Sequence, residues 1–270
     1  MSERPEMISL LGTAHYARPA TGEELAHLQR DLAEAEATLA EDPDGVDAHV
    51  MYGRRLSYLW RYHEAIAAYS DALERFGDSA SLYRHRGHRY LSIRRFGPAA
   101  RDMARAFELD PEDFDICYHL GLARWLLGDW EGAREVYEDF LPKCEDPEQQ
   151  VAMSYWFYLT LRRLDEQERA EALLENVGTP DGVTENVNYL DLLRLFRGDV
   201  DDAGILELAK EGPLPAGTLG FGLGCKYLLE GDLDRASECF ETVTRGPYWP
   251  AFGFIAGEVE LARLRGMLAS

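Results

Sequence analysis

Residues 81–111, SLYRHRGHRYLSIRRFGPAARDMARAFELDP, contain the pattern that decides the fold. Gly87, near the start of this stretch, has counterparts 34 residues to either side, at Gly53 and Gly121. Alanines repeat at the same interval in a second register: Ala65, Ala99 and Ala133. Self-similarity at a fixed period of roughly 20 to 50 residues is the signature of repeat architectures. The two registers therefore predict a chain built from repeated units.

A second motif, Gly-Asp-x-(Asp/Glu)-x-Ala, indicates what each unit contains. Its three copies begin at Gly128, Gly198 and Gly231. A glycine after a helix takes the left-handed conformation that ends it, and acidic residues favour the N-terminus of the next helix. Glycine inside a helix costs about 1 kcal/mol relative to alanine, so its recurrence implies close helix packing. We therefore expect each unit to be a pair of helices.

This pattern resembles the tetratricopeptide repeat. Six residues of the quoted stretch fall at the offsets of that family: Tyr83, Gly87, Tyr90, Ala99, Ala106 and Pro111. The resemblance extends from about Val46 to Arg245. It implies an all-α fold, a right-handed α-solenoid of about six helix pairs with capping helices at both ends.

The repeat register divides the chain into four parts. We expect a flexible N-terminal tail at 1–21, a capping helix at 22–42, repeats over 43–247 and a C-terminal capping helix at 248–270. The six expected repeats are 46–79, 80–113, 114–147, 148–183, 184–216 and 217–247.

Composition excludes several classes of function. The 270 residues carry 49 acidic and 28 basic side chains, a formal net charge of −21. Non-specific nucleic-acid binding and attachment to an anionic membrane both depend on cationic side chains, so neither is expected. No apolar run approaches the roughly 20 residues that cross a bilayer, and the start lacks the pattern of a signal peptide. We expect an acidic, cytoplasmic protein.

Residues 34 apart in successive first helices should form rungs across the concave surface, which in this family usually binds extended peptides. One rung begins with Arg54 and His88, and another contains Arg84 and Tyr118. The predicted groove residues are Arg54, Arg84, His88, Tyr118, Trp125, Trp156, Phe196 and Phe221. The aromatic members have an alternative place in the hydrophobic core.

Charge is distributed unevenly along the chain. Residues 46–105 have eleven basic and six acidic side chains, whereas the segments on either side are acidic. Four histidines, His49, His63, His85 and His88, could add charge below their usual pKa near 6.5. Arginine suits carboxylates and phosphates, so the pattern predicts a ligand with an acidic portion and an apolar portion. Alternatively, these arginines pair with acidic residues of neighbouring units.

The sequence thus favours a non-catalytic scaffold that binds a protein or peptide segment in its groove. It contains no nucleotide-binding, metal-binding or nucleophile-elbow motif, so no cofactor, metal or catalytic residue is expected. One alternative is an enzyme or small-molecule binder, which a convergent pocket of histidine, arginine and carboxylate would favour. Another is self-association of acidic units with the basic units of a second copy.

Overall fold

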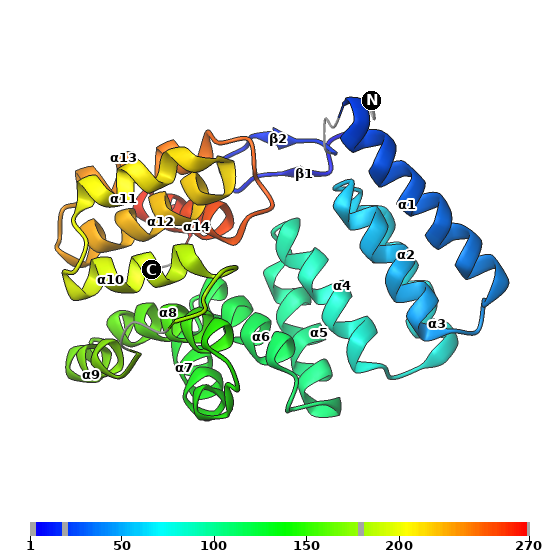
Figure 1. The fold of residues 1–270 in the computed structure, drawn as a ribbon, viewed down its shortest axis with the longest axis horizontal. Helices are drawn as coiled ribbons and strands as arrows, with labels where there is room; N and C mark the ends of the chain where they lie inside the picture. The colour runs from blue at the N-terminus through cyan, green and yellow to red at the C-terminus, as the bar shows by residue number, and fades with distance from the viewer. Residues whose placement is uncertain (1–3, 18–20, 178–180, 269–270) are drawn as a thin grey trace. The chain divides into compact units, whose positions relative to one another are not determined.

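A computed structural model of the chain describes residues 4–17, 21–177 and 181–268. These residues form fourteen α-helices, two short 3₁₀-helices and one two-stranded hairpin (Figure 1). The predicted all-helical class is confirmed, and fourteen described helices are the number that six pairs and two capping helices require. None of the described helices combines the length and the apolar run that a bilayer crossing requires.

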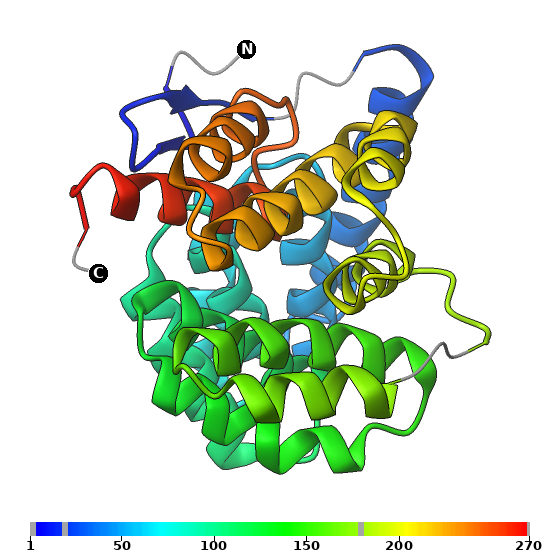
Figure 2. The same cartoon turned by 90° about the vertical axis from the view of Figure 1, so that its left-hand side faces the viewer.

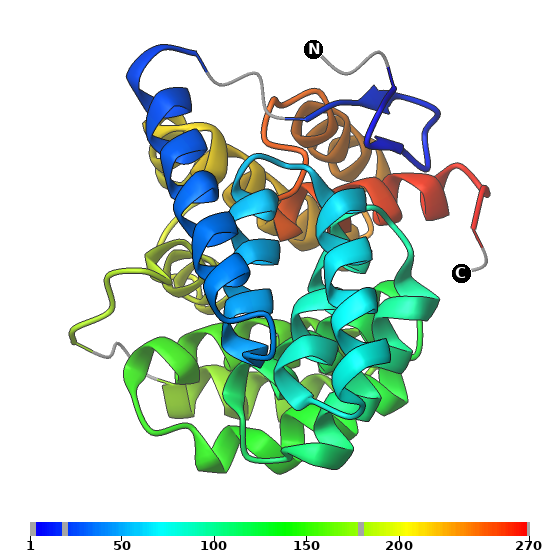
Figure 3. The same ribbon diagram turned by 90° about the vertical axis from the view of Figure 1, so that its right-hand side faces the viewer.

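The chain divides into two compact units, which we call the N-terminal unit (Met1–Ala123) and the C-terminal unit (Arg124–Ser270). The N-terminal unit contains β1 (Met7–Ile8), β2 (Ala14–His15), α1 (Gly22–Glu41), α2 (Val46–Tyr58), α3 (Tyr62–Phe76), α4 (Ala80–Ser92), α5 (Phe96–Leu109) and most of α6 (Phe114–Leu127). Consecutive helices from α1 to α5 pack on one another, and α2 also packs against α4 (Figure 3).

The C-terminal unit contains the remaining pairs. Its elements are α7 (Trp130–Phe140), η1 (Leu141–Lys143), α8 (Pro147–Arg163), α9 (Gln167–Val177), α10 (Val187–Arg197), α11 (Asp202–Leu208), η2 (Ala209–Glu211), α12 (Pro213–Leu229), α13 (Leu233–Thr244) and α14 (Phe252–Leu264). Helix α8 packs between α7 and α9, and α12 packs against both α13 and α14 (Figure 2).

Two of the glycines inside first helices, Gly53 and Gly224, sit where an aromatic ring of the second helix approaches. A Cβ added to Gly53 would lie 2.3 Å from Cε1 of Tyr69, and one added to Gly224 would lie 2.4 Å from Cε1 of Phe240. Tyr69 and Phe240 are both buried. The helix propensity lost at glycine is therefore offset by close packing within each pair.

The Gly-Asp motif performs the predicted end-and-start role. Gly128, Gly198 and Gly231 all have positive φ, between 81° and 86°. Asp129 then caps α7 by accepting from Gly132 N at 3.1 Å, and Asp232 caps α13 in the same way. In the middle copy the cap is the second acidic residue, so α11 begins at Asp202.

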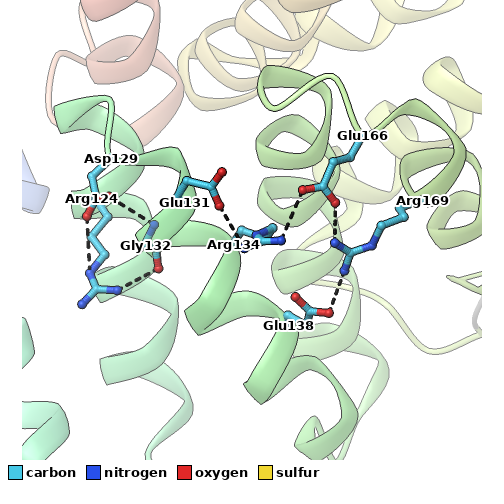
Figure 4. A network of polar contacts seen from close by, with 8 residues as sticks. All are labelled: Arg124, Asp129, Glu131, Gly132, Arg134, Glu138, Glu166 and Arg169. Carbon is cyan, nitrogen blue, oxygen red and sulfur yellow. Dashed lines mark hydrogen bonds and ion pairs between the residues drawn. The ribbon is translucent and has the colours of Figure 1, made fainter.

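Ion pairs join α7 to the start of α9 (Figure 4). Arg134 contacts Glu131 at 2.9 Å and Glu166 at 3.3 Å. Arg169 pairs with the same Glu166 and with Glu138, at 2.7 Å from the latter. These arginines therefore link two consecutive expected repeats within the C-terminal unit.

The segment before α1 contains a hairpin that the sequence analysis does not predict. Met7 pairs with His15 and Ile8 with Ala14, in antiparallel register. The side chain of Glu6, which is buried, accepts a hydrogen bond from the backbone N–H of His63 at the start of α3. Residues 1–3 and 18–20 of the expected tail lie outside the described residues.

Candidate functional site

Three of the predicted groove residues come together in one pocket of the N-terminal unit. Arg54 comes from α2, and Arg84 and His88 come from α4. The pocket has a volume of about 330 Å³. We call it the basic pocket; its lining consists of Arg54, Ser57, Tyr58, Tyr69, Arg84, His85, His88, Arg89, Asp115 and His119.

The repeat geometry explains this convergence. Gly53 and Gly87 face the second helices of their pairs, and Arg54 and His88 each follow one of these glycines. The next residue of an α-helix lies about 100° further round the axis, because a turn contains about 3.6 residues. Equivalent positions of α2 and α4 therefore present Arg54 and His88 toward the same pocket.

The three arginines have different partners. Arg84 forms an ion pair with Asp115, and its guanidinium also lies 3.1 Å from Nε2 of His85. Arg54 donates to the hydroxyl of Tyr58 at 3.1 Å, and Arg89 lies over the ring of Tyr62, 5.3 Å from its centroid. Among the described residues, no carboxylate lies within ion-pair distance of Arg54 or Arg89. Two cations of the basic pocket therefore lack an anionic partner within the described chain.

The histidines of the basic pocket are neutral at physiological pH. Burial, reinforced by the neighbouring arginines, lowers the pKa of His85 to about 3 and that of His88 well below its ordinary value. Burial likewise lowers the pKa of His119 to about 4. The expectation that His85 and His88 gain positive charge as the pH falls below about 6.5 is therefore wrong, because a sequence alone does not show how deeply a ring is buried.

The neutral rings line the pocket in fixed positions. His119 Nδ1 donates to the backbone carbonyl of Asp115 at 2.5 Å, which fixes the proton on that nitrogen. The rings of His88 and His119 lie 4.5 Å apart between centroids. His85 stacks on Tyr69, whose pKa is raised to about 12, mainly by burial. Three cations against one anion leave the basic pocket cationic.

Comparison with known proteins bears on the helix pairs that form this pocket. Residues 85–146, which include part of its lining, match the family model described as "Tetratricopeptide repeat". Residues 85–146 therefore contain tetratricopeptide repeat sequence. A curated relative, human Tetratricopeptide repeat protein 12, is 26% identical over 147 residues, which make up 54% of this chain and 20% of that protein. The chain thus spans about a fifth of the length of that relative.

Two solved structures share the tetratricopeptide fold. One is a tetratricopeptide repeat protein from Parabacteroides merdae, with a TM-score of 0.59, 16% identity, and coverage of 89% of this chain and 94% of the other. The second is YrrB, a tetratricopeptide repeat protein with an unusual peptide-binding site, with a TM-score of 0.50 and 15% identity. It is matched over 87% of this chain and 98% of its own. At these identities the likeness shows the fold alone.

The aromatic residues predicted for the groove occupy other places in the tetratricopeptide pairs. Trp125, Trp156 and Phe221 are at most 1% exposed. Their ring centroids lie between 5.3 and 6.0 Å from one another. Their assignment to an open groove is corrected: they form an aromatic cluster in the core, because burying large apolar rings against one another removes most area from water.

The remaining two aromatic residues differ from that cluster. Tyr118 is buried beside the basic pocket, with its ring edge-to-face to His119 at 5.1 Å. Phe196 is half-buried and packs on Tyr158, 4.6 Å between centroids. Phe196 alone among the five predicted aromatic residues keeps an appreciable exposed surface in the described structure.

Several arginines of the basic segment are already paired. Arg86 makes two hydrogen bonds to Asp102, at 2.7 and 2.8 Å, and Arg55 pairs with Asp31 at 2.9 Å. The alternative interpretation, pairing with a neighbouring element, therefore holds for Arg55, whose partner lies in the capping helix α1, whereas Arg86 pairs within its own repeat. Within the described part of the chain, no group of three or more His, Cys, Asp or Glu residues could hold a metal ion.

Sequence reasoning missed Asp115, His119 and Tyr69 as lining residues. Two lining residues do belong to the repeat pattern. Tyr69 is the aromatic residue of a second helix, and Ser57 lies on the same rung as Leu91 and Trp125. Asp115 gave no signal in the rung pattern, because it lies 31 rather than 34 residues after Arg84. It reaches the pocket from the first turn of α6.

Proposed function

We propose that this tetratricopeptide chain is a non-catalytic interaction scaffold that binds an acidic segment of a protein partner in the basic pocket. The observation that carries this proposal is the convergence of Arg54, Arg84 and Arg89 on one pocket inside an acidic chain. Arginine offers a planar fork of donors that matches a carboxylate with two parallel hydrogen bonds. The unusual peptide-binding site of YrrB is consistent with this use of the fold.

The net negative charge of the chain adds selectivity for how the ligand is presented. Residues 106–270 carry thirty-three acidic and fourteen basic side chains. Such an excess repels free anions over distances of about 8 Å at physiological salt. A short acidic segment on a protein with a basic or neutral surface would therefore reach the pocket more readily than a uniformly acidic protein.

The basic pocket itself favours one second candidate, a binder of small anionic molecules. Histidine, arginine and aspartate side chains line this pocket of about 330 Å³, and that combination favours the binding of small anionic molecules. Acid–base catalysis is less suited to it, because an efficient general base has a pKa near the working pH. The pKa values of His85 and His119, about 3 and about 4, lie far below neutrality.

Fluorescence anisotropy distinguishes these candidates. The probes are fluorescein-labelled Gly-Ser peptides with one to four consecutive glutamates, and the controls are the matching glutamine peptides. We expect affinity to rise with each glutamate and to fall several-fold between 50 and 500 mM NaCl. Equal binding of the glutamine series would overturn the proposal. Displacement of the four-glutamate peptide by succinate or inorganic phosphate at equal concentration would favour the small-molecule candidate instead.

Self-association is tested separately by sedimentation equilibrium. A molar mass of 30.6 kDa that is independent of salt and protein concentration would exclude the assembly of acidic units on basic ones.

A further inference from the structure

Asp115 is the sole carboxylate among the residues that line the basic pocket in the described structure. It lies in the first turn of α6, and its side chain is 51% exposed. Its carboxylate pairs with the guanidinium of Arg84. The pocket thus already contains one carboxylate bound to one of its three arginines.

The other two arginines have only uncharged partners within the described chain. Arg54 donates to the phenol of Tyr58, and Arg89 lies over the ring of Tyr62. An approaching acidic segment therefore finds Arg84 already paired with a carboxylate, whereas Arg54 and Arg89 have no anionic partner in the described chain. The three arginines are not equally available to the ligand. The carboxylate of Asp115 stands where a ligand carboxylate would make its contact with Arg84.

Asp115 can give up this contact at little cost. Because half of the Asp115 side chain is exposed, water and salt screen its ion pair with Arg84, and such a screened pair changes an equilibrium by about fivefold at most. The first turn of a helix also favours a negative charge through the helix dipole, whatever the position of Arg84. An aspartate at the start of α6 therefore has a favourable environment both with and without its arginine.

This inference rests on the proposed function. We propose that Asp115 is an internal competitor: its carboxylate occupies the position at Arg84 where a carboxylate of the ligand would bind. The bound segment displaces it and places its own carboxylate on Arg84, between the contacts that Arg54 and Arg89 supply. Asp115 thereby lowers the affinity of the pocket for every acidic segment and makes it specific for those that carry enough negative charge to displace it.

The test measures the affinity of the four-glutamate peptide for Asp115→Asn. Asparagine keeps the shape of the side chain, and the hydrogen bond from His119 to the backbone carbonyl of residue 115 does not depend on the side chain. We expect the dissociation constant to fall about twofold to fivefold. The matched control is Asp71→Asn, which removes one exposed carboxylate of α3 outside the pocket and should change the constant less than twofold.

A double-mutant cycle shows whether the effect passes through Arg84. In an Arg84→Ala background, Asp115→Asn should give no further gain, because there is no guanidinium left to release. A gain that persists there, or an unchanged or weaker affinity of Asp115→Asn, would overturn the competitor role while the proposed function stands. Absence of binding in both the wild type and Asp115→Asn would overturn the proposed function itself.

Discussion

Arg263 in α14 donates to Glu260 at 2.6 Å, with the two side chains 8% and 1% exposed, and the same guanidinium reaches the backbone carbonyl of Leu126 at 3.1 Å. Arg163 of α8 pairs with Glu260 from the other side. The C-terminal helix is thus held to α6 and α8 by one buried carboxylate between two arginines.

We expect Arg263→Gln to lower the free energy of unfolding by about 2 kcal/mol, because the buried carboxylate of Glu260 then keeps only Arg163 as a cationic partner. Urea unfolding followed by circular dichroism measures this. Arg265→Gln is the control: Arg265 pairs with Glu241 at an exposed site and should cost less than about 1 kcal/mol. Equal losses for the two variants would contradict the structural role of the buried pair.

Gly53 should not tolerate a methyl group. A Cβ there would lie 2.3 Å from the ring of Tyr69, and such overpacking costs about 1–3 kcal/mol, more than the improved helix propensity returns. We expect Gly53→Ala to lower the urea midpoint. At Gly97 the nearest atom to an added Cβ is Nη1 of Arg101 at 3.7 Å, so Gly97→Ala should change the stability by less than about 1 kcal/mol. A stabilised Gly53→Ala variant would show that α2 and α3 are not closely packed there.

Stability should fall as the pH drops below about 6.5. Unfolded histidines bind protons near that pH, whereas burial keeps His85 and His119 unprotonated down to about pH 3 to 4 in the folded chain. The unfolded state therefore binds more protons in this window, and each such histidine lowers the free energy of unfolding by at most about 1.4 kcal/mol per pH unit.

Urea unfolding at pH 7.5, 6.5 and 5.5 tests this sign. His85→Gln should reduce the change in the free energy of unfolding with pH. His63→Gln, at an exposed position of α3, controls for the loss of a histidine. The same slope in wild type and His85→Gln would mean that the ring of His85 accepts a proton in the folded state.

Glu148 holds the segment before α10. Its carboxylate accepts backbone hydrogen bonds from Thr184, Glu185 and Asn186, the latter two at 2.9 and 2.8 Å. Although desolvation by itself raises the pKa of Glu148, these bonds together lower it to about 2. We expect Glu148→Gln to speed amide exchange at residues 184–186 at pH 7, while Glu145→Gln, on an exposed neighbour, leaves it unchanged. In wild type the protection should weaken as the pH falls from about 4.5 toward 2, because the carboxylate takes up a proton in that range only when the segment opens, which favours opening.

Much of the fold follows from local patterns in the sequence. The glycines at 53, 87 and 121 mark the first helix of each of the first three pairs, and the Gly-Asp motifs mark where helices end and begin. The hairpin at 7–15 escapes such reasoning, because two-residue strands have no periodicity and are held by contacts such as that of Glu6 with the start of α3.

The site is predictable only where register determines position. Arg54 and His88 share a rung because they lie one period apart, and both line the basic pocket. The register does not show whether other helices pack over a rung. Trp125 and Trp156 follow the same periodic pattern, yet both are buried in an aromatic cluster. Nor does it show how far burial lowers the pKa of a histidine, which depends on every element packed around the ring.

The central claim is that the arginines of the basic pocket bind an acidic segment. Its most direct test compares the affinity of the four-glutamate peptide for Arg54→Glu/Arg84→Glu with that for Arg95→Glu/Arg101→Glu, two exposed arginines outside the pocket lining. Both double variants change the net charge by the same amount. We predict that the pocket variant loses at least tenfold in affinity at 50 mM NaCl, while the control variant loses less than threefold. Equal losses would show that only overall charge matters and would contradict the account.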